Sequence, residues 1–372
     1  MATNQKTTPT TLLGLNTEEL GAVAREQGEP TYRGKQLAEW IYRWGVREFA
    51  QMTNLPNRLR AQLSDNYQVG RSQLVFARHS RDATVKLLLA MGDGQTVETV
   101  GLPYASYFSC CVSTQVGCPV RCAFCATGMS GYTRNLTAGE IVDQVLTVQE
   151  AVKSPQPPLA SPLSPLSISD GEGVGGEARR VSHVVFMGMG EPLLNYADTV
   201  KAVRLFNSEL GIGMRHLTVS TVGFVPGIRQ LAQERLQITL AVSLHAPNDD
   251  LRRRLIPTMI RWDLDEILDA CRDYFRQTGR RVTFEYCLLD RVNDGVAEAR
   301  ELAQVLRGLN CHVNLIPYNP VVELGFEAPS AVRVRAFREV LEQAGIPVTQ
   351  RVQRGADIEA ACGQLRRATI SL

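Results

Sequence analysis

Three cysteines within eight residues, Cys118, Cys122 and Cys125, constrain this chain more than any other feature of its sequence. Thiolates bind soft metals, so a loop with this spacing can direct three sulfur atoms at one inorganic centre. A structural zinc site needs a fourth protein ligand, and neither a second Cys pair nor a His-x₃₋₅-His pattern accompanies the three. An iron–sulfur cube held at three corners would instead leave one iron open to a ligand. The spacing favours the cluster and leaves zinc and coincidence as alternatives.

The Cys-x₃-Cys-x₂-Cys pattern, with Phe124 just before the last cysteine, resembles the signature of radical S-adenosylmethionine (SAM) enzymes. Further segments together resemble the RlmN family of dual-specificity RNA adenine C2-methyltransferases, from about Thr17 to Leu365. These segments are residues 97–99, 111–118, 188–195, 243–249, 314–320 and 360–364. The resemblance implies a [4Fe-4S] cluster on the three cysteines, with SAM bound to the open iron.

Length and composition bound the class of protein. With 372 residues the chain exceeds one average domain, so we expect a large core and an accessory domain. No apolar run is long enough to cross a membrane and the polar start lacks a signal-peptide core, which predicts a cytoplasmic protein with no membrane partner. The nine cysteines lack the regular spacing of a disulfide framework and indicate reduced thiols. The net charge of +2 permits an RNA partner without arguing for one.

Apolar β-branched runs alternate with amphipathic segments after about residue 104, which predicts an α/β fold with a parallel sheet. Strands are expected near residues 107–114, 182–187, 216–221, 237–243, 281–288 and 311–316. Six such units indicate a partial (β/α)₆ barrel, an open relative of the eight-stranded barrel, and the resemblance implies the radical SAM core. Thr137 and Glu140 have the spacing of a capping box, so a helix is expected to begin there.

Composition and pattern divide the chain into a disordered N-terminus (1–16), a small helical accessory domain (17–72), a short β linker segment (73–103), the core (104–355) and a C-terminal segment (356–372). Residues 154–180 are rich in Ser, Pro and Gly and cannot bury a core, so we expect a disordered insertion without an assigned role.

The accessory domain is expected to hold three helices, the first capped by Asn16 or Thr17 and the third starting after Asn54 and Pro56. Its basic and aromatic side chains could contact phosphates and stack on unpaired bases, or the aromatics could fill a small helical core. The resemblance implies RNA binding here. The side chains concerned are Tyr32, Arg33, Lys35, Tyr42, Arg43, Trp44 and Arg47.

Candidate SAM ligands follow the predicted strands, at the edge where parallel α/β barrels collect function. Taken singly, Ser220, Ser243, Asn319 and His245 are more often structural. Gly190 and Glu191 could form a loop turn, or they could allow close approach of a ligand and accept hydrogen bonds from an amine or ribose hydroxyls. The resemblance assigns the whole set to SAM, with one leucine acting through its backbone. The set is Gly190, Glu191, Ser220, Ser243, Leu244, His245 and Asn319.

Two further thiols and one carboxylate receive roles from the resemblance. Cys362 is the methyl-carrying cysteine, Cys111 is the resolving thiol that forms a transient disulfide with it, and Glu98 is the proton acceptor. By default Glu98 would be a solvated strand residue. Cys110 has no motif counterpart, which leaves open whether it could replace Cys111. The remaining cysteines, Cys271, Cys287 and Cys311, are expected to be buried apolar residues.

C2 of adenine is electrophilic, so a polar attack on the SAM methyl group fails there and a radical route is required. The resemblance implies two SAM molecules per methyl group and two substrates, an adenosine in the peptidyl-transferase centre of 23S rRNA and the adenosine 3′ of the anticodon in tRNA. It also implies a flavodoxin or ferredoxin reducing system. The alternatives are a C8-adenine methyltransferase of the antibiotic-resistance type and a non-enzymatic zinc-containing RNA-binding protein. The sequence leaves oligomeric state, substrate preference and the physiological electron donor open.

Overall fold

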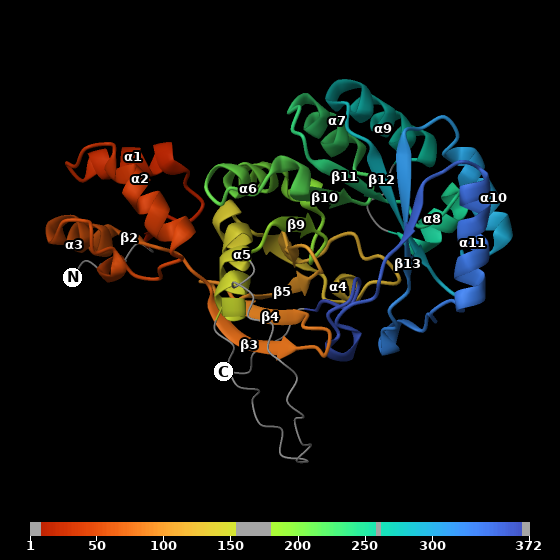
Figure 1. The fold of residues 1–372 in the computed structure, drawn as a ribbon, viewed down its shortest axis with the longest axis horizontal. Coiled ribbons are helices and arrows are strands. Elements are labelled where there is room, and N and C mark those ends of the chain that lie inside the picture. The colour runs from red at the N-terminus through yellow and green to blue at the C-terminus, as the bar shows by residue number, and fades with distance from the viewer. Residues whose placement is uncertain (1–8, 154–179, 258–261, 367–372) are drawn as a thin grey trace, which may run out of the picture.

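A computed structural model describes residues 9–153, 180–257 and 262–366 and shows a helical N-terminal unit beside an α/β core (Figure 1). The expected insertion lies outside the described residues except for Arg180. Within those residues no helix is long and apolar enough to cross a membrane.

The N-terminal unit contains helices α1, α2 and α3 and a pair of two-residue parallel strands, β1 and β2. The expected cap is present, since Asn16 and Glu19 form a capping box at the start of α1. The expected N-terminal disorder does not extend to residues 9–16, where β1 pairs with β2 and Leu12 is fully buried. The bounds are β1 Thr10–Thr11, α1 Thr17–Glu26, α2 Arg33–Ala38 continued by a π turn Glu39–Arg43, α3 Asn57–Asn66 and β2 Tyr67–Gln68.

The aromatic side chains proposed for RNA divide into two groups. Tyr42 is buried, accepts a hydrogen bond from the Gly14 N–H (3.0 Å) and donates one to the Leu15 carbonyl (2.6 Å), so it belongs to the helical core. Tyr32 and Trp44 are 58% and 61% exposed and remain accessible to a base.

A ten-stranded sheet forms the core, in the order β14-β13-β12-β11-β10-β9-β6-β5-β4-β3. The seven strands from β6 to β14 in that order are parallel, whereas β3, β4 and β5 are antiparallel. The bounds are β3 Gln73–His79, β4 Val85–Ala90, β5 Thr96–Pro103, β6 Phe108–Cys111, β9 His183–Phe186, β10 Leu217–Thr221, β11 Thr239–Ser243, β12 Val282–Leu288, β13 Cys311–Pro317 and β14 Val348–Gln350.

The six predicted parallel strands are therefore confirmed, and β14 is an additional one. The sequence analysis missed β14 because it has three residues, two of them exposed, and no apolar run. Strands β3 to β5 extend the main sheet through the β5–β6 pairing instead of forming a separate layer. The sheet ends at β3 and β14 without closing, which confirms the partial barrel.

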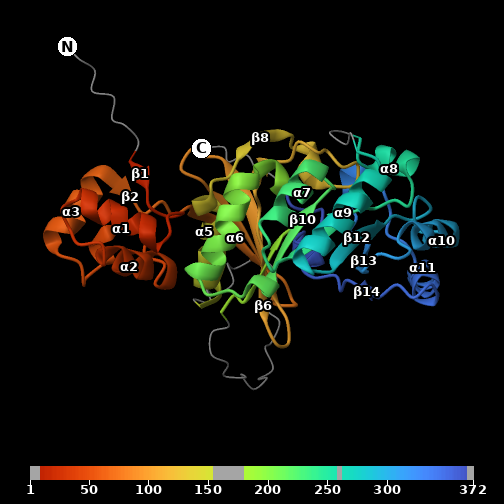
Figure 2. The same ribbon diagram turned by 90° about the horizontal axis from the view of Figure 1, so that it is seen from above.

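Helices cover the outer side of the curved sheet (Figure 2). Thr137 caps α5 as predicted. The Thr137 Oγ1 accepts a hydrogen bond from the Glu140 N–H (3.2 Å), and the Glu140 carboxylate accepts one from the Thr137 N–H (2.9 Å). A separate hairpin, β7 Gln115–Gly117 with β8 Tyr132–Asn135, flanks the cysteine loop. The helices are α4 Ala126–Met129, α5 Ala138–Lys153, α6 Tyr196–Ser208, α7 Val225–Gln233, α8 Asp249–Leu255, α9 Leu264–Thr278, α10 Val296–Val305 and α11 Ala331–Gln343.

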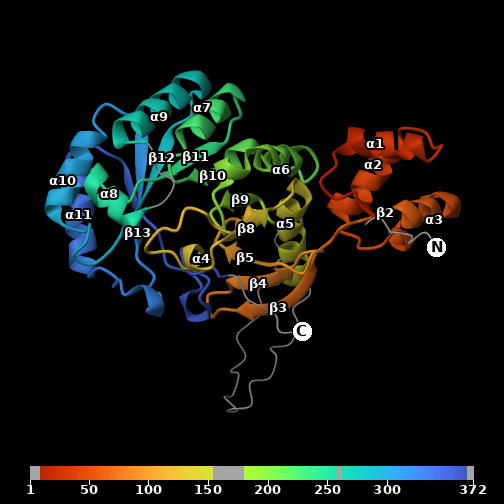
Figure 3. The same cartoon turned by 180° about the vertical axis from the view of Figure 1, so that it is seen from behind.

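The chain after β14 returns across the mouth of the sheet and passes beside α4 (Figures 1 and 3). The Ala126 N–H at the start of α4 bonds to the Gly363 carbonyl (2.8 Å), and the Thr127 hydroxyl bonds to the Leu365 carbonyl (2.7 Å). This return brings Cys362 next to the cysteine loop, although 237 residues separate it from Cys125 in the sequence.

Candidate active site

A cavity of about 150 Å³ lies at the carboxyl ends of the parallel strands. It gathers residues that were predicted separately from the sequence, from four different strand ends and from the C-terminal segment. Those that line it are Cys122, Cys125, Gly190, Glu191, Ser220, Ser243, His245 and Cys362. The structure does not place Cys118, Leu244, Asn319, Cys111 or Glu98 on its wall.

The cysteine loop follows β7 and is held at both ends. The Cys118 N–H bonds to the Gly131 carbonyl (2.9 Å) and the Cys125 N–H bonds to the Cys122 carbonyl (3.1 Å). Gly117 enters the loop with φ +78°, and a Cβ there would lie 1.8 Å from the Gly131 oxygen, so only glycine fits. The hairpin thus sets the direction in which the loop leaves the sheet.

The thiols of this loop are buried and close to one another, and the charge of Arg252 opposes these effects at Cys122 only weakly. Burial, followed by the charge of the other thiolates, raises the pKa of Cys122, and burial raises the pKa of Cys118 to about 12. In the described part of the chain no three His, Cys, Asp or Glu side chains converge closely enough to share one metal ion. The loop is therefore not a preformed closed zinc site, whose four ligands lie about 2.0–2.3 Å from the metal. Three loop thiols, of which Cys122 and Cys125 line the cavity, fit a larger inorganic cluster that brings its own positive charge.

Gly190 and Glu191 form the wall next to β9. Gly190 has φ +106°, and a Cβ would lie 2.7 Å from the Gln115 side chain, so the glycine permits close approach to the chain's own β7. The Glu191 carboxylate accepts from the Leu193 N–H (3.0 Å) and the Val222 N–H (2.8 Å). Burial raises the pKa of Glu191 to about 7 against these two bonds. Each oxygen retains acceptor capacity toward the cavity.

Ser220 and Ser243 end neighbouring strands, β10 and β11, and their hydroxyl oxygens lie 3.5 Å apart. Leu244 is fully buried, and its N–H bonds to the Glu285 carbonyl (3.0 Å). These residues supply two short hydroxyls at the mouth and a buried backbone beside them.

His245 follows directly and closes the same side of the cavity. Its Nδ1 accepts a hydrogen bond from the Cys287 N–H (2.9 Å). The centroids of the His245 and Phe124 rings lie 4.8 Å apart in a T-shaped arrangement. Burial, followed by the nearby charge of Arg252, lowers the pKa of His245 to about 3. The imidazole is therefore neutral, with the proton on Nε2.

The loop that carries Cys362 is fixed by hydrogen bonds to several elements. The Asn319 amide donates to the Cys362 carbonyl (3.1 Å) and its oxygen accepts from Gln353. The Gln364 amide bonds to the Pro320 carbonyl (3.1 Å). Asn319 thus uses both ends of its amide to hold the C-terminal loop, a position the sequence analysis had given to SAM.

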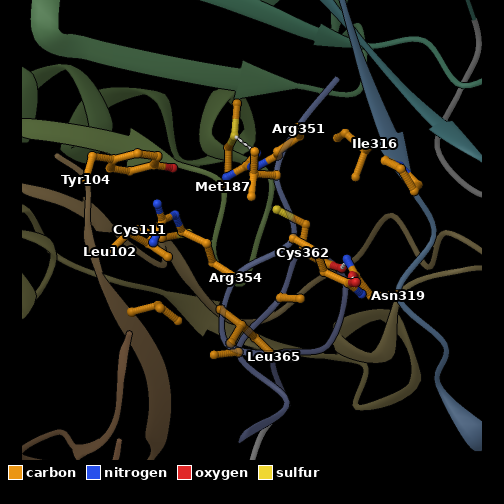
Figure 4. A pocket seen from close by; sticks show the side chains of 16 residues that line it. Leu102, Tyr104, Cys111, Met187, Ile316, Asn319, Arg351, Arg354, Cys362 and Leu365 are labelled. Atoms are coloured by element: carbon orange, nitrogen blue, oxygen red, sulfur yellow. Dashed lines mark hydrogen bonds between the residues drawn. The ribbon is translucent and has the colours of Figure 1, made fainter. Parts of the chain in front are cut away.

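A second cavity, of about 40 Å³, adjoins the first and is lined by both cysteines that were assigned a role in methyl transfer (Figure 4). Cys111, at the end of β6, and Cys362 both line it. Cys362 also lines the first cavity, so its sulfur stands at the junction of the two. Burial, followed by the Cys362 charge, raises the pKa of the Cys111 thiol.

Cys110 points away from this chemistry. Side chains alternate along a strand, so Cys110 and Cys111 lie on opposite faces of β6. The Cys110 sulfur is fully buried, 3.6 Å from the Thr99 hydroxyl, and is absent from the residues that line either cavity. Cys271, Cys287 and Cys311 are buried as expected, and all nine cysteines are free thiols.

Glu98 is buried rather than solvated. Its carboxylate pairs with Lys86 (3.0 Å) on β4 and accepts from the Arg366 backbone N–H (2.8 Å). The alternation of β5 puts it on the same face as Val100 and Leu102, which line the second cavity. Glu98 itself does not line that cavity, whereas Leu365, next to its partner Arg366, does.

Arg351 is a site residue that the sequence reasoning missed. It lines both cavities and donates to the Met187 sulfur (3.4 Å), as Figure 4 shows. The Cys362 thiolate, ahead of Glu285 and Cys111, raises its pKa, so a fixed positive charge faces both reactive thiols. No signal marked it, because it lies in a polar stretch after the short β14.

Comparisons with known proteins agree with this geometry. Residues 10–69 match the family model "Ribosomal RNA large subunit methyltransferase N-terminal domain", and residues 164–303 match the radical SAM superfamily. Two relatives are each named "Probable dual-specificity RNA methyltransferase RlmN". The one from Gloeobacter violaceus is 52% identical, and the match covers 98% of this chain and 97% of the relative. The one from Thermosynechococcus vestitus is 48% identical, and the match covers 96% of this chain and 99% of the relative. A crystal structure of a radical SAM methyltransferase from Sphaerobacter thermophilus superposes with a TM-score of 0.87 at 45% identity, covering 96% of this chain and 99% of that one.

Proposed function

The chain belongs to the RlmN family of dual-specificity RNA methyltransferases in the radical SAM superfamily, and from this premise we propose that it methylates C2 of adenosine in two RNAs. The substrates are the adenosine in the peptidyl-transferase centre of 23S rRNA and the adenosine 3′ of the tRNA anticodon. The observation that supports this most is the position of Cys362, which lies between the cavity of the cysteine loop and the cavity of Cys111.

Cys118, Cys122 and Cys125 would hold a [4Fe-4S] cluster, since three loop thiols and no fourth ligand suit a cluster with one open iron. The cluster and SAM, when bound, supply the methyl group and the carbon-centred radical that polar chemistry cannot provide at C2. The cavity wall supplies acceptors for SAM. The residues proposed to bind SAM are Gly190, Glu191, Ser220, Ser243 and His245, which line that wall, together with Leu244 through its backbone and Asn319, which do not line it.

Cys362 takes the methyl group first. Its thiolate attacks the methyl carbon, a new sulfur–carbon bond forms, and the bond to the sulfonium breaks as S-adenosylhomocysteine leaves. After one hydrogen atom is removed from the methylthio group, the remaining methylene joins the Cys362 sulfur to C2 of adenine. Arg351 lines both cavities together with Cys362 and is proposed to help position the reactants of this step.

Cys111 then releases the product. Its thiolate attacks the Cys362 sulfur, the sulfur–methylene bond breaks, and the carbon takes a proton to become the methyl group of the base. The two thiols give up two electrons in forming the disulfide, which equals the two that reductive cleavage of one SAM consumes. A flavodoxin or ferredoxin system would restore both thiols. Glu98, whose carboxylate accepts from the Arg366 N–H, is proposed to accept the C2 proton.

The N-terminal unit would hold the RNA. Trp44 and Tyr32 are exposed there, and an Arg lies over each ring, Arg43 at 5.5 Å and Arg33 at 5.0 Å from the ring centroid. Both proposed substrates offer unpaired bases that can be turned out of a stack. A reducible cluster and these RNAs place the protein in the cytoplasm.

The test is anaerobic incubation of reconstituted protein with SAM, a low-potential reductant and rRNA or tRNA transcripts, followed by mass spectrometry of the nucleosides. We expect 2-methyladenosine at one position in each RNA. 8-Methyladenosine would favour the C8-methylating relative instead. About one zinc per chain, no acid-labile sulfide and no methylation would replace the proposal with a zinc-containing RNA-binding protein.

A further inference from the structure

Arg252 is the largest fully buried side chain of the described residues, and it lies beside the cysteine loop. It belongs to α8, directly after β11, and is 1% exposed. Arginine is almost never fully buried unless a partner compensates its charge, because removing a charge from water costs several kcal/mol. A partner of opposite charge is therefore expected next to it.

Among the described residues, the Arg252 guanidinium has no anionic hydrogen-bond partner. Nη2 donates to the Val222 carbonyl, whereas Nε and Nη1 have no acceptor within the described residues. Asp249, the nearest carboxylate on its own helix, accepts from the Leu264 N–H (3.0 Å), and no ion pair with Arg252 is found in the described ranges. Three N–H groups are thus buried without a partner, each at a cost of about 1–3 kcal/mol.

The cysteine loop packs against the helix that carries these donors. Burial lowers the pKa of Arg252 to about 10, and the charge of Cys122, ahead of that of Asp249, opposes this lowering. The loop and α8 are directly joined, because the Ala123 N–H bonds to the Leu255 carbonyl (2.8 Å). Leu251 and Leu255 of α8 also pack in one apolar cluster with the three loop cysteines.

The donors do not face the site proposed for SAM. Arg252 is absent from the residues that line the first cavity, and its Nε and Nη1 are closed to solvent. Arg252 therefore lies outside that cavity, on the helix that packs against the loop. A ligand there must be anionic, rich in acceptors and already buried against the loop. Thiolate and sulfide atoms of an iron–sulfur cluster meet all three requirements.

We propose that Arg252 donates hydrogen bonds to cluster sulfur atoms at Cys122 and thereby eases one-electron reduction of the cluster. The inference rests on the proposed function, because it presupposes that the loop holds a cluster. Reduction adds one negative charge to the cluster, and a fixed cation with N–H groups on its sulfurs stabilises the reduced form more than the oxidised form. The electron comes from the low-potential donor already invoked. Arg252 thus tunes the cluster and touches neither SAM nor RNA.

The test compares reduction potentials of reconstituted full-length protein, measured by anaerobic titration monitored by EPR. Arg252→Met keeps the bulk of the side chain without charge or donors, and Arg252→Lys keeps the charge. Arg253→Met is the matched control, since Arg253 is on the same helix with its side chain 65% exposed. We expect Arg252→Met to reduce at least tenfold less favourably, a shift of about 59 mV or more to lower potential. Arg252→Lys is expected to lie between it and the wild type, and Arg253→Met to match the wild type.

An unchanged potential in Arg252→Met, with full iron and sulfide content, would overturn the proposal. If Arg252→Met holds no cluster, the contact is tested instead in the wild type and in Arg252→Lys, both labelled with ¹⁵N-arginine. Pulsed EPR of the reduced wild type is expected to show a ¹⁵N coupling that Arg252→Lys lacks, and its absence from the wild type would refute the contact. A wild-type protein without any cluster would instead refute the proposed function, and iron and sulfide analysis shows this separately.

Discussion

We predict that the free energy of unfolding falls as the pH is lowered, because His245 is buried as the neutral imidazole. The imidazole is 6% exposed, its Nδ1 holds the Cys287 N–H at 2.9 Å, and the charge of Arg252 is near. Burial is the larger cause that lowers its pKa from 6.5 to about 3. Protonation in the folded state would break the bond to Cys287 and place a second cation beside Arg252.

The magnitude follows from proton linkage. Below pH 6.5 the unfolded chain binds a proton at His245 that the folded chain does not, so the contribution is present above pH 6.5 and is lost as the pH falls toward 3. The limiting slope is about 1.4 kcal/mol per pH unit. With a pKa of 6.5 in the unfolded chain and about 3 in the folded chain, proton linkage gives a loss of about 2 kcal/mol in the free energy of unfolding between pH 7 and pH 5.

The assay is urea denaturation of the metal-free protein at pH 7, 6 and 5, for the wild type and for His245→Gln. Glutamine keeps an acceptor for the Cys287 N–H but does not titrate, and all other titrating groups cancel in the difference. We expect the variant to be less stable at pH 7 and to lose about 2 kcal/mol less than the wild type by pH 5. Parallel stability curves for the two proteins would refute the reasoning.

Three further predictions follow from the site and its surroundings. Cys111→Ala should accumulate protein covalently joined to RNA, seen on denaturing gels, whereas Cys110→Ala should turn over normally because its side chain faces away from the cavity; turnover by Cys111→Ala would remove the resolving role. Lys86→Met should lower the free energy of unfolding, measured by urea denaturation, by about 3–5 kcal/mol, because it leaves the buried Glu98 without its ion-pair partner. The double variant Lys86→Met/Glu98→Met should recover most of this loss. Equal losses in the single and double variants would show that the two side chains are not coupled. Trp44→Ala should weaken RNA binding by about 1–3 kcal/mol in a fluorescence titration with unchanged unfolding, and unaltered affinity would exclude stacking on that ring.

The sequence predicted the fold where periodicity was strong. The six parallel strands carry buried β-branched runs, and Thr137 and Glu140 have the spacing that the two reciprocal hydrogen bonds of the α5 capping box require. Short elements without an apolar run, such as β1 and β14, could not be found this way, because pairing with neighbouring strands defines them rather than their own composition.

The candidate site was predictable where a motif and a strand end coincide, as at Glu191 and Ser243. It was not predictable where tertiary packing decides the partner of a side chain. Asn319 holds the Cys362 loop, and Arg351 and Arg252 face thiols far away in sequence. Burial of Glu98 likewise depends on Lys86 and on the backbone of Arg366, neither of which a local pattern reveals.

The central claim is that Cys362 carries the methyl group between SAM and adenine, and a pulse-chase experiment tests it most directly. The reconstituted protein is first turned over with SAM labelled in the methyl group, freed of it, and then given RNA, reductant and unlabelled SAM. We expect mass spectrometry to find the label on the peptide with Cys362 before the chase and on C2 of the first methyladenosine formed after it. Unlabelled 2-methyladenosine in that first turnover, with the label still on the protein or never there, would contradict the account.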